Sequence, residues 1–320
     1  MESVRLACSW AAAVMGVPKT TAITAAMKAS NMYADCFTLQ NYFLFSIRRA
    51  IIPIFFNNFA GGKRTDSTMN LTIDIGNTCT KLVAFDGDEP VGEMRMDDGE
   101  LHKFDGFCAG YPFERGICSS VVDVPEGLRR RLEAAPFPVM RLVSGVTPVP
   151  VNNRYATPLT LGTDRLAAVV GAHFKSGGRD VLVIDVGTCI TYDFITAAGD
   201  YLGGNISPGP TMRLKALGAF AGALPVVDRK GDTPPMGYST ETAIRSGVMR
   251  GVTYEIESYI RDFILKCPGL FVYLTGGVHL DLHIPEKKCI FADNFIVPYG
   301  LNRILLYNEE IAFNEKNSYL

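Results

Sequence analysis

A short phrase that occurs twice constrains the fold of this 320-residue chain more than any other feature. Ile73-Asp74-Ile75-Gly76 returns 111 positions later as Ile184-Asp185-Val186-Gly187, and a threonine follows each copy, at 78 and 188. Each copy lies at the end of an apolar, β-branched run and is followed by another extended run. These runs are 71–75 and 80–85 around the first copy, and 181–186 and 190–195 around the second. Two hairpins of one design predict a duplicated α/β domain, with one acidic residue from each half facing a shared cleft.

The chemistry of the repeated phrase indicates a site for nucleotide phosphate. A buried strand ends directly after Asp74, and another ends directly after Asp185, so each carboxylate is expected at the carboxyl end of its strand. The glycine that follows lets the backbone turn close to a ligand. The hydroxyl groups of Thr78 and Thr188, with the free N–H groups beside them, are suited to phosphate oxygens.

Composition and charge exclude some classes of partner. Apolar residues make up 48% of the chain, which is enough for the cores of two ordinary domains. The formal net charge is −2 and the basic residues are scattered. A protein that binds nucleic acid or an anionic membrane normally shows a basic patch, so we expect neither partner.

The cysteines and histidines favour a cytoplasmic protein without a structural metal site. The eight cysteines show no Cys-x-x-Cys spacing, and Cys79, Cys118 and Cys189 are expected inside strands, as reduced thiols. His279 and His283 have the helical spacing of metal ligands. Because no glutamate lies between them and no third ligand accompanies them, histidines on the surface or in a loop are favoured over a metal site.

The segment before the first repeat differs from the rest of the chain. Residues 1–68 contain an apolar stretch, but Arg48-Arg49 and Pro53 interrupt it, so it fits a membrane span poorly. The basic residues also lack the order expected in a signal peptide. The glycine-rich run 61–67 is typical of a flexible linker and ends just before Met69. We therefore expect 1–68 to be an extension outside the catalytic fold.

Two further motifs carry chemistry. Residues 74–81 have the form Asp-x-Gly-Asn-Thr-x-x-Lys, and strand alternation places Lys81 within reach of the same phosphate. A second motif, Tyr155-Ala-Thr-Pro-Leu-Thr-Leu-Gly-Thr-Asp-Arg165, opens a helical run. Thr163 is predicted to cap that helix, so Asp164 would lie in its first turn, where backbone N–H groups point outward.

The remaining segments follow in a fixed order. The pattern predicts a Gly-Gly-x-Ile-x-Pro-Gly loop at 203–209, a helix ending near 223–225, a long helix over 240–265 and a strand ending at 274–277. The basic run 129–131 lies on a predicted amphipathic helix, 125–134, where a solvated face explains it better than an anion site.

Taken together and in this order, the motifs resemble those of type III pantothenate kinase, the bacterial enzyme of coenzyme A synthesis. The resemblance covers residues 69 to about 308. It implies two ribonuclease-H-like domains of the actin-like ATPase superfamily around a nucleotide cleft, which we place at 69–178 and 179–320. It also implies ATP and pantothenate as substrates, Mg²⁺ with ATP, a K⁺ or NH₄⁺ ion, and a homodimer.

The resemblance carries roles to individual positions. Asp164 matches the proton acceptor of the family, Asp185 a ligand of the monovalent cation, and Thr188 an ATP contact. The ATP phosphate loop corresponds to Asp74, Ile75, Gly76, Asn77, Thr78, Cys79, Thr80 and Lys81. The pantothenate contacts correspond to Tyr155, Gly162, Thr163, Asp164, Arg165 and Thr240. Cys189, Pro210 and Ser239 depart mildly from the usual family residues without removing a group that the chemistry needs.

Physical alternatives stand beside several of these roles. Asp164 is also explained as a carboxylate favoured by the helix dipole, Arg165 as a surface salt bridge, and Tyr155 as a loop aromatic packed on the core. Asp185 could simply accept local backbone N–H bonds. For the whole chain, the alternatives are another small-molecule kinase of the same superfamily and a catalytically inactive regulatory homologue.

Overall fold

The computed structural model describes residues 69–278, 280, 282–284 and 289–317. The expected extension 1–68 and the histidine at position 279 lie outside these described residues. Within them, no helix is both long enough and apolar enough to cross a membrane. The described residues belong to one compact unit, 67–320.

The first sheet of the described part has five strands in the order β3-β2-β1-β4-β5. Its strands are β1 (Met69–Ile75), β2 (Thr80–Asp86), β3 (Glu89–Met96), β4 (Phe113–Ser120) and β5 (Val139–Arg141). Two helices, α4 (Leu101–Ala109) and α5 (Glu126–Glu133), connect the later strands. β1 and β2 form the predicted first hairpin, in which Asp74 pairs with Lys81.

The second sheet has six strands in the order β11-β10-β7-β8-β9-β6. They are β6 (Asn152–Asn153), β7 (Val181–Val186), β8 (Cys189–Ile195), β9 (Asp200–Pro208), β10 (Phe271–Thr275) and β11 (Ile290–Ala292). The other helical elements are η1 (Pro158–Thr160), α6 (Thr163–Ser176), α7 (Pro210–Phe220), α8 (Thr240–Lys266) and α9 (Ile296–Asn317). β7 and β8 form the predicted second hairpin, in which Asp185 pairs with Thr191.

The two sheets repeat one topology. In each, three consecutive strands form an antiparallel meander, and a later strand lies parallel to the first, β4 to β1 and β10 to β7. A fifth strand then adds in parallel, β5 to β4 and β11 to β10. The order β3-β2-β1-β4-β5 is therefore matched by β9-β8-β7-β10-β11, with β6 added at the β9 edge. The predicted α/β fold with a duplicated sheet is confirmed.

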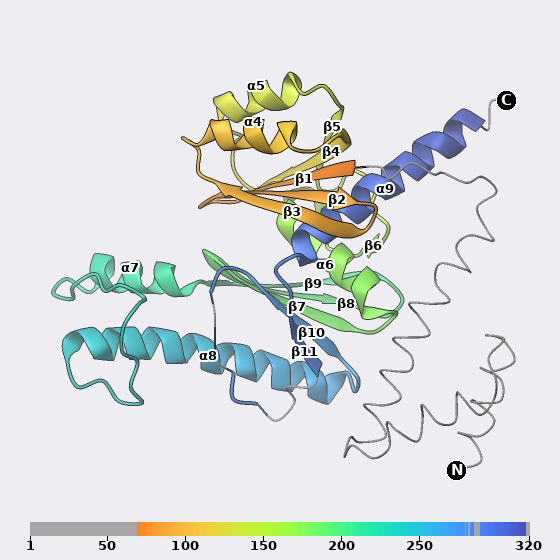
Figure 1. Ribbon diagram of the computed structural model, residues 1–320. Helices are drawn as coiled ribbons and strands as arrows, with labels where there is room; N and C mark the ends of the chain where they lie inside the picture. Colours follow the sequence, from red (N-terminus) through yellow and green to blue (C-terminus); the bar gives the residue numbers. More distant parts are fainter. Residues whose placement is uncertain (1–68, 279, 281, 285–288, 318–320) are drawn as a thin grey trace, which may run out of the picture. The chain divides into compact units, whose positions relative to one another are not determined.

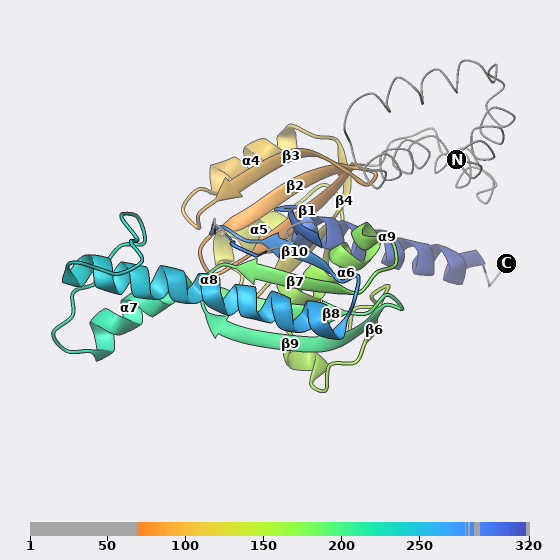
Figure 2. The same ribbon diagram turned by 90° about the horizontal axis from the view of Figure 1, so that it is seen from below.

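Helices and sheets alternate in layers (Figures 1 and 2). Helices α4 and α5 cover the outer face of the first sheet, where Phe104 and Leu128 join its core. Helix α8 covers the outer face of the second sheet through residues such as Ile256. Helices α6 and α9 form the middle layer, and one apolar cluster joins them to strands of both sheets.

Helices α6 and α9 cross in backbone contact. A Cβ atom added to Gly300 would lie 1.8 Å from the carbonyl oxygen of Ala167, and one added to Gly171 would lie 2.2 Å from that of Ile296. No side chain larger than hydrogen fits at either glycine. Asn302 of α9 also accepts a hydrogen bond of 2.8 Å from the amide of Asn70 in β1. The last described helix is thus fastened both to α6 and to the first sheet.

The structure corrects three details of the sequence analysis. The segment 203–209 is not a loop: it lies in strand β9 up to Pro208 and pairs with β8. The following helix ends at Phe220 and not near 223–225. Cys79 lies in the turn before β2, whereas Cys118 and Cys189 lie in strands as expected. Every cysteine in the described part of the chain is a free thiol.

Candidate active site

The two hairpin turns lie against each other. In the first turn the N–H of Gly76 donates to the carbonyl of Cys79 at 3.1 Å, and in the second the N–H of Gly187 donates to Cys189 at 2.9 Å. The hydroxyl oxygens of Thr78 and Thr188 are 3.3 Å apart. The predicted convergence of the two copies is confirmed, because the repeated threonines meet across the site.

The carboxylates of the site lie close enough to influence one another. Burial, followed by the charges of Asp164 and Asp185, raises the pKa of Asp74 from 3.8 to about 7, against the opposing charge of Lys81 and a hydrogen bond with Ser119. Burial and the charges of Asp164 and Asp193 raise the pKa of Asp185 to about 7 in the same way. Uncompensated negative charge is therefore concentrated beneath the two turns, which suits a cation.

Asp164 lies at the start of α6. Gly162, not Thr163, is the N-cap residue of this helix, so the predicted capping role of Thr163 is wrong. The Thr163 hydroxyl is engaged by strand β4 instead, since it accepts from Ser119 at 2.9 Å and donates to the carbonyl of Ser120 at 3.2 Å. Asp164 does lie in the first turn, as predicted, and burial raises its pKa although the Arg165 N–H donates to its Oδ1 at 2.8 Å.

Arg165 is paired with a carboxylate that the sequence analysis did not single out. Its Nε lies 3.0 and 3.1 Å from the two oxygens of Asp193 in β8, and its Nη2 lies 2.6 Å from Oδ1. The two side chains are 6% and 1% exposed, so the alternative of a surface salt bridge is wrong. Burial alone would lower the pKa of Arg165, but the hydrogen bonds and charge of Asp193 raise it.

Tyr155 lies beside this buried pair. The Arg165 guanidinium carbon is 5.5 Å from the centre of the Tyr155 ring, and that ring stacks on Tyr201 with centroids 6.0 Å apart. The Tyr201 hydroxyl donates to Oδ1 of Asp193 at 2.7 Å. The structure therefore brings together three of the predicted substrate contacts, Tyr155, Asp164 and Arg165.

Lys81 occupies the position opposite Asp74 in the first hairpin, but its amine is directed elsewhere. Nζ donates to the carbonyl of Asn294 at 2.6 Å, lies 3.5 Å from Glu93 and stands 4.7 Å from the centre of the Phe295 ring. Burial lowers the pKa of this amine, and the Glu93 carboxylate opposes that effect. Its charge acts on both Asp74 and Asp185.

Two glycines pack closely against the backbone of the second turn, the one that follows Asp185. Gly276 follows β10 with a φ of +104°, and a Cβ there would lie 2.4 Å from the carbonyl oxygen of Val186 and 2.7 Å from Oδ1 of Asp185. Gly209 donates its N–H to the Thr188 carbonyl at 3.0 Å, and a Cβ there would lie 2.2 Å from the carbonyl oxygen of Gly187. The position of the Asp185 turn thus depends on close backbone packing.

A cavity opens beside the first turn. Its volume is about 640 Å³, and residues Gly76 to Cys79 form one of its walls. The carboxylates of Asp97, Asp98 and Asp123 line another part of it. No three His, Cys, Asp or Glu side chains of the described chain form a metal-ligand set by themselves. A cation bound here would therefore take further ligands from its substrate or from water, as Mg²⁺ commonly does.

Thr240 lies apart from the other predicted substrate contacts. It is exposed at the start of α8, where Ser239 is the N-cap and accepts from the N–H of Thr242 at 3.2 Å. Both ribbon views show this end of α8 beside α7, beyond the edge of the second sheet and apart from α6 (Figures 1 and 2). Within one chain, Thr240 and Asp164 do not meet.

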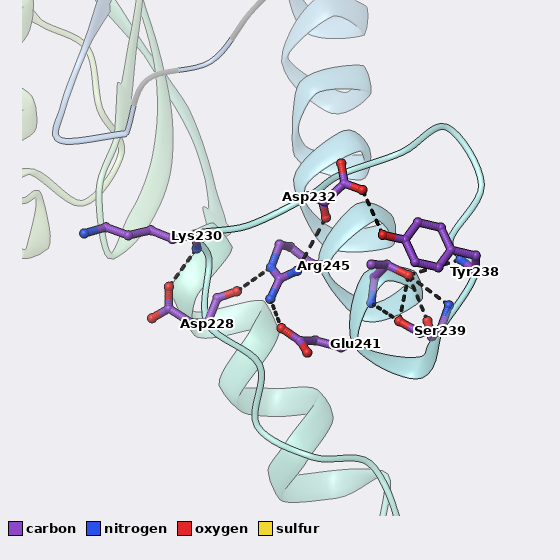
Figure 3. A network of polar contacts seen from close by, with 8 residues as sticks. Asp228, Lys230, Asp232, Tyr238, Ser239, Glu241 and Arg245 are labelled. Carbon is purple, nitrogen blue, oxygen red and sulfur yellow. Dashed lines mark hydrogen bonds and ion pairs between the residues drawn. The ribbon is translucent and has the colours of Figure 1, made fainter.

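A buried arginine organises the segment that leads to α8 (Figure 3). Arg245 donates from Nε to the carbonyl of Asp228 at 2.9 Å, and from Nη1 to that of Asp232 at 3.4 Å. It also forms an ion pair with Glu241 one turn earlier in α8. These bonds hold the α7–α8 connection against the start of α8, so Thr240 projects from an ordered scaffold.

Sequence reasoning missed Ser119, Asp193 and Tyr201, which hold the predicted residues in place. Asp193 had one usable signal, because it is the single charged residue in the strand run 189–195. An unpaired carboxylate is costly there, so a cationic partner was to be expected. The identity of the partner depends on how β8 lies against α6, which no local pattern encodes.

Comparisons with known proteins identify the family of this chain. The sequence profile of the family described as type III pantothenate kinase matches residues 70–262. The type III pantothenate kinase of Phocaeicola vulgatus is 51% identical over 243 residues, covering 76% of this chain and 100% of that protein. Those of Bacteroides fragilis strain ATCC 25285 and Azobacteroides pseudotrichonymphae are 50% and 40% identical and cover 75% and 76% of this chain and 98% of their own lengths. The chain therefore belongs to the type III pantothenate kinase family.

Proposed function

We propose that this protein transfers the γ-phosphoryl group of ATP to the primary alcohol of pantothenate, forming 4′-phosphopantothenate for coenzyme A synthesis. One observation carries the proposal beyond family membership. Three carboxylates, Asp74, Asp164 and Asp185, lie beneath two turns that meet at Thr78 and Thr188, and the charge of Asp164 raises the pKa of both others. Phosphoryl transfer requires little more of a protein than alignment of the hydroxyl and neutralisation of spreading negative charge.

The phosphates of ATP would be held by the two turns. The hydroxyl groups of Thr78 and Thr188 lie where one phosphate chain can contact both. The positive charge of Lys81 favours the ionised forms of Asp74 and Asp185. The oxygen atoms of these carboxylates and hydroxyl groups suit Mg²⁺. Asp74 would hold the ion directly or through water, and the ion would neutralise charge on the phosphates.

Asp164 is proposed as the general base that accepts the proton of the pantothenate hydroxyl. Burial raises its pKa above the ordinary value, which makes it a stronger base than an exposed aspartate. The hydrogen bond from the Arg165 N–H to Oδ1 fixes the orientation of the carboxylate and leaves Oδ2 for the substrate. The Ser119–Thr163 hydrogen bond fixes the first turn of α6 on the first sheet.

A monovalent cation, K⁺ or NH₄⁺, is proposed at Asp185. Asp185 is a half-buried residue at the end of β7, and burial and the neighbouring aspartates disfavour its ionised form. A bound cation would stabilise that ionised form.

We further propose a homodimer in which Thr240 reaches the pantothenate site of the partner. Within one chain the start of α8 is remote from α6, yet Arg245 holds it in order. Around it, large apolar side chains are exposed: Phe220 is 90%, Met236 83% and Tyr238 76% exposed. Closed two-fold pairing would cover them. Light scattering that finds an active monomer at assay concentration would refute this pairing.

The test of the activity is an ADP-release assay on the purified protein with ATP, Mg²⁺ and K⁺. We expect turnover with pantothenate and none with a panel of sugars. Turnover of a sugar in place of pantothenate would support another kinase of the superfamily. A folded protein without turnover of any substrate would support a regulatory homologue.

A further inference from the structure

One edge of the Arg165 guanidinium is fully engaged by protein. Nε and Nη2 both face the Asp193 carboxylate, at distances of 2.6 to 3.1 Å. An arginine presents five N–H donors in a planar fork, so two edges can each bind a carboxylate. Asp193 pairs with the edge formed by Nε and Nη2, so a second anion would bind through the edge that contains Nη1.

The Asp193 carboxylate has a site built for it. It lies opposite Gly204 in the β8–β9 pair, and a Cβ at Gly204 would lie 2.6 Å from its Oδ1 and 1.9 Å from the carbonyl oxygen of Tyr192. Only glycine leaves room for the carboxylate there. The carboxylate is 1% exposed and also accepts the Tyr201 hydroxyl. A buried charge with this many partners is held in one orientation.

The same carboxylate reaches Tyr155 indirectly. Tyr201 donates to Asp193 and its ring stacks on Tyr155, with only 7° between the ring planes. The Arg165 guanidinium stands over the same Tyr155 ring at 5.5 Å. From its place on β8, Asp193 therefore fixes Arg165 and Tyr201, and both of these side chains contact the ring of Tyr155.

We propose that Asp193 is a positioning residue for the substrate: it holds Arg165, and through Tyr201 holds Tyr155, so that the second edge of the guanidinium binds the carboxylate of pantothenate. This inference rests on the proposed pantothenate kinase activity. The Thr163 hydroxyl fastens the start of α6 to the first sheet, while Asp193 fastens it to the second. Asp164 lies between these two attachments, and the Asp193 charge also contributes to raising its pKa.

The consequence is a defect confined to one substrate. Without Asp193, the guanidinium loses its fixed orientation, and binding of the pantothenate carboxylate must restore it. The KM for pantothenate should therefore rise, while the KM for ATP, which depends on the hairpin turns, stays the same. A loss of general stability would instead lower the amount of active enzyme and leave both KM values unchanged.

The sharpest test compares two variants that each remove one buried tyrosine hydroxyl group. Tyr201→Phe removes the hydroxyl that donates to Asp193, and Tyr192→Phe removes a hydroxyl that donates to Glu255 at 2.8 Å. Both tyrosines are fully buried, at 0% and 1% exposure, and Tyr192 belongs to the core on the other face of the sheet. We expect Tyr201→Phe to raise the KM for pantothenate roughly 3- to 10-fold, the worth of one hydrogen bond. Tyr192→Phe should change neither KM.

Asp193→Asn is the stronger variant, with an expected rise in the pantothenate KM above about tenfold. Because it leaves the Arg165 charge buried and unpaired, circular dichroism must first show that it folds. If it does not fold, the tyrosine pair decides. The inference is overturned if Tyr201→Phe leaves the pantothenate KM unchanged, or raises the KM for ATP equally. Absence of pantothenate turnover in the unmodified enzyme would refute the proposed function instead, which keeps the two failures distinct.

Discussion

The hydroxyl oxygens of Thr78 and Thr188, 110 residues apart in sequence, lie 3.3 Å from each other across the two hairpin turns. Each threonine lies in the turn that follows one copy of the same short phrase, so the contact joins the turns of the two repeats. It brings the carboxyl ends of β1 and β7 to one place.

Asp164→Asn should lower kcat by about 10²- to 10⁴-fold, because the amide cannot accept the hydroxyl proton. The affinity for ATP should barely change, since Asp164 lies on α6 and not in the turns. Steady-state kinetics and an ATP-binding titration check the two parts. Near-normal turnover in this variant would give Asp164 a purely structural role.

Activity should depend on K⁺ or NH₄⁺ and be weak in Na⁺ alone, because Asp185 is proposed to hold a larger monovalent ion. Rates measured in the three chloride salts at constant Mg²⁺ and ionic strength test this. Asp185→Asn should lower the response to K⁺. Equal rates of the unmodified enzyme in all three salts would remove the cation from the proposal.

The free energy of unfolding should fall as the pH rises toward neutrality. Asp74 and Asp185 have pKa values of about 7 in the folded protein against 3.8 as the ordinary value. Between these values the folded state binds more protons than the unfolded chain, so raising the pH favours unfolding. Asp74→Asn should therefore reduce the drop in Tm between about pH 5 and about pH 8.

The control for this titration is the exposed Glu310→Gln on α9, which should leave the drop in Tm unchanged. Differential scanning calorimetry without added nucleotide gives the slopes. An equal drop in Tm with pH for the unmodified protein and for Asp74→Asn would contradict the raised pKa of Asp74.

Gly276→Ala should lower the free energy of unfolding by about 1 to 3 kcal/mol, because an alanine is strained at positive φ. Its methyl group would also press on the Val186 backbone and on Asp185, so activity should fall with stability. The neighbouring Gly277→Ala is the matched control, since a Cβ there meets nothing within 4 Å. Chemical denaturation of both variants measures the difference. Equal stability would show that the chain relaxes freely around Gly276.

A chain that begins at Met69 should match the full-length protein in kinase rate and in Tm. Every proposed site residue lies after this position, and the described unit has its own apolar cores. The assay is a side-by-side comparison of soluble expression, melting and turnover. A clear loss of Tm on truncation would show instead that the apolar part of 1–68 packs on the catalytic unit.

The sequence predicted the parts of the fold that depend on local patterns. The two hairpins and the position of Asp164 in a first helical turn follow from strand alternation and from residue types at element ends. Thr163 was assigned as a cap because caps are local, yet its hydroxyl found tertiary partners in Ser119 and Ser120. Competition of that kind is decided by packing, and packing is not visible in a single segment.

The prediction of a loop in the glycine-rich segment before α7 is wrong for a related reason. Gly203 and Gly204 suggest a loop, but in β9 they make room for neighbours: Gly203 lies under the Tyr155 ring and Gly204 against the Tyr192 carbonyl. The ion pair of Arg165 with Asp193 depends on the same sheet surface. A sequence shows which side chains need partners, whereas the sheet and helix positions determine which partners they obtain.

The close crossing of α6 and α9 has a consequence for how the protein is made. Helix α9 covers α6 and contacts β1, yet it is the last described helix in the chain. While the ribosome is still synthesising the second sheet, the face of the first sheet that α9 will cover remains bare. The middle core closes only after residues 296–317 have emerged, so a nascent chain stalled before Ile296 exposes apolar surface to chaperones and proteases.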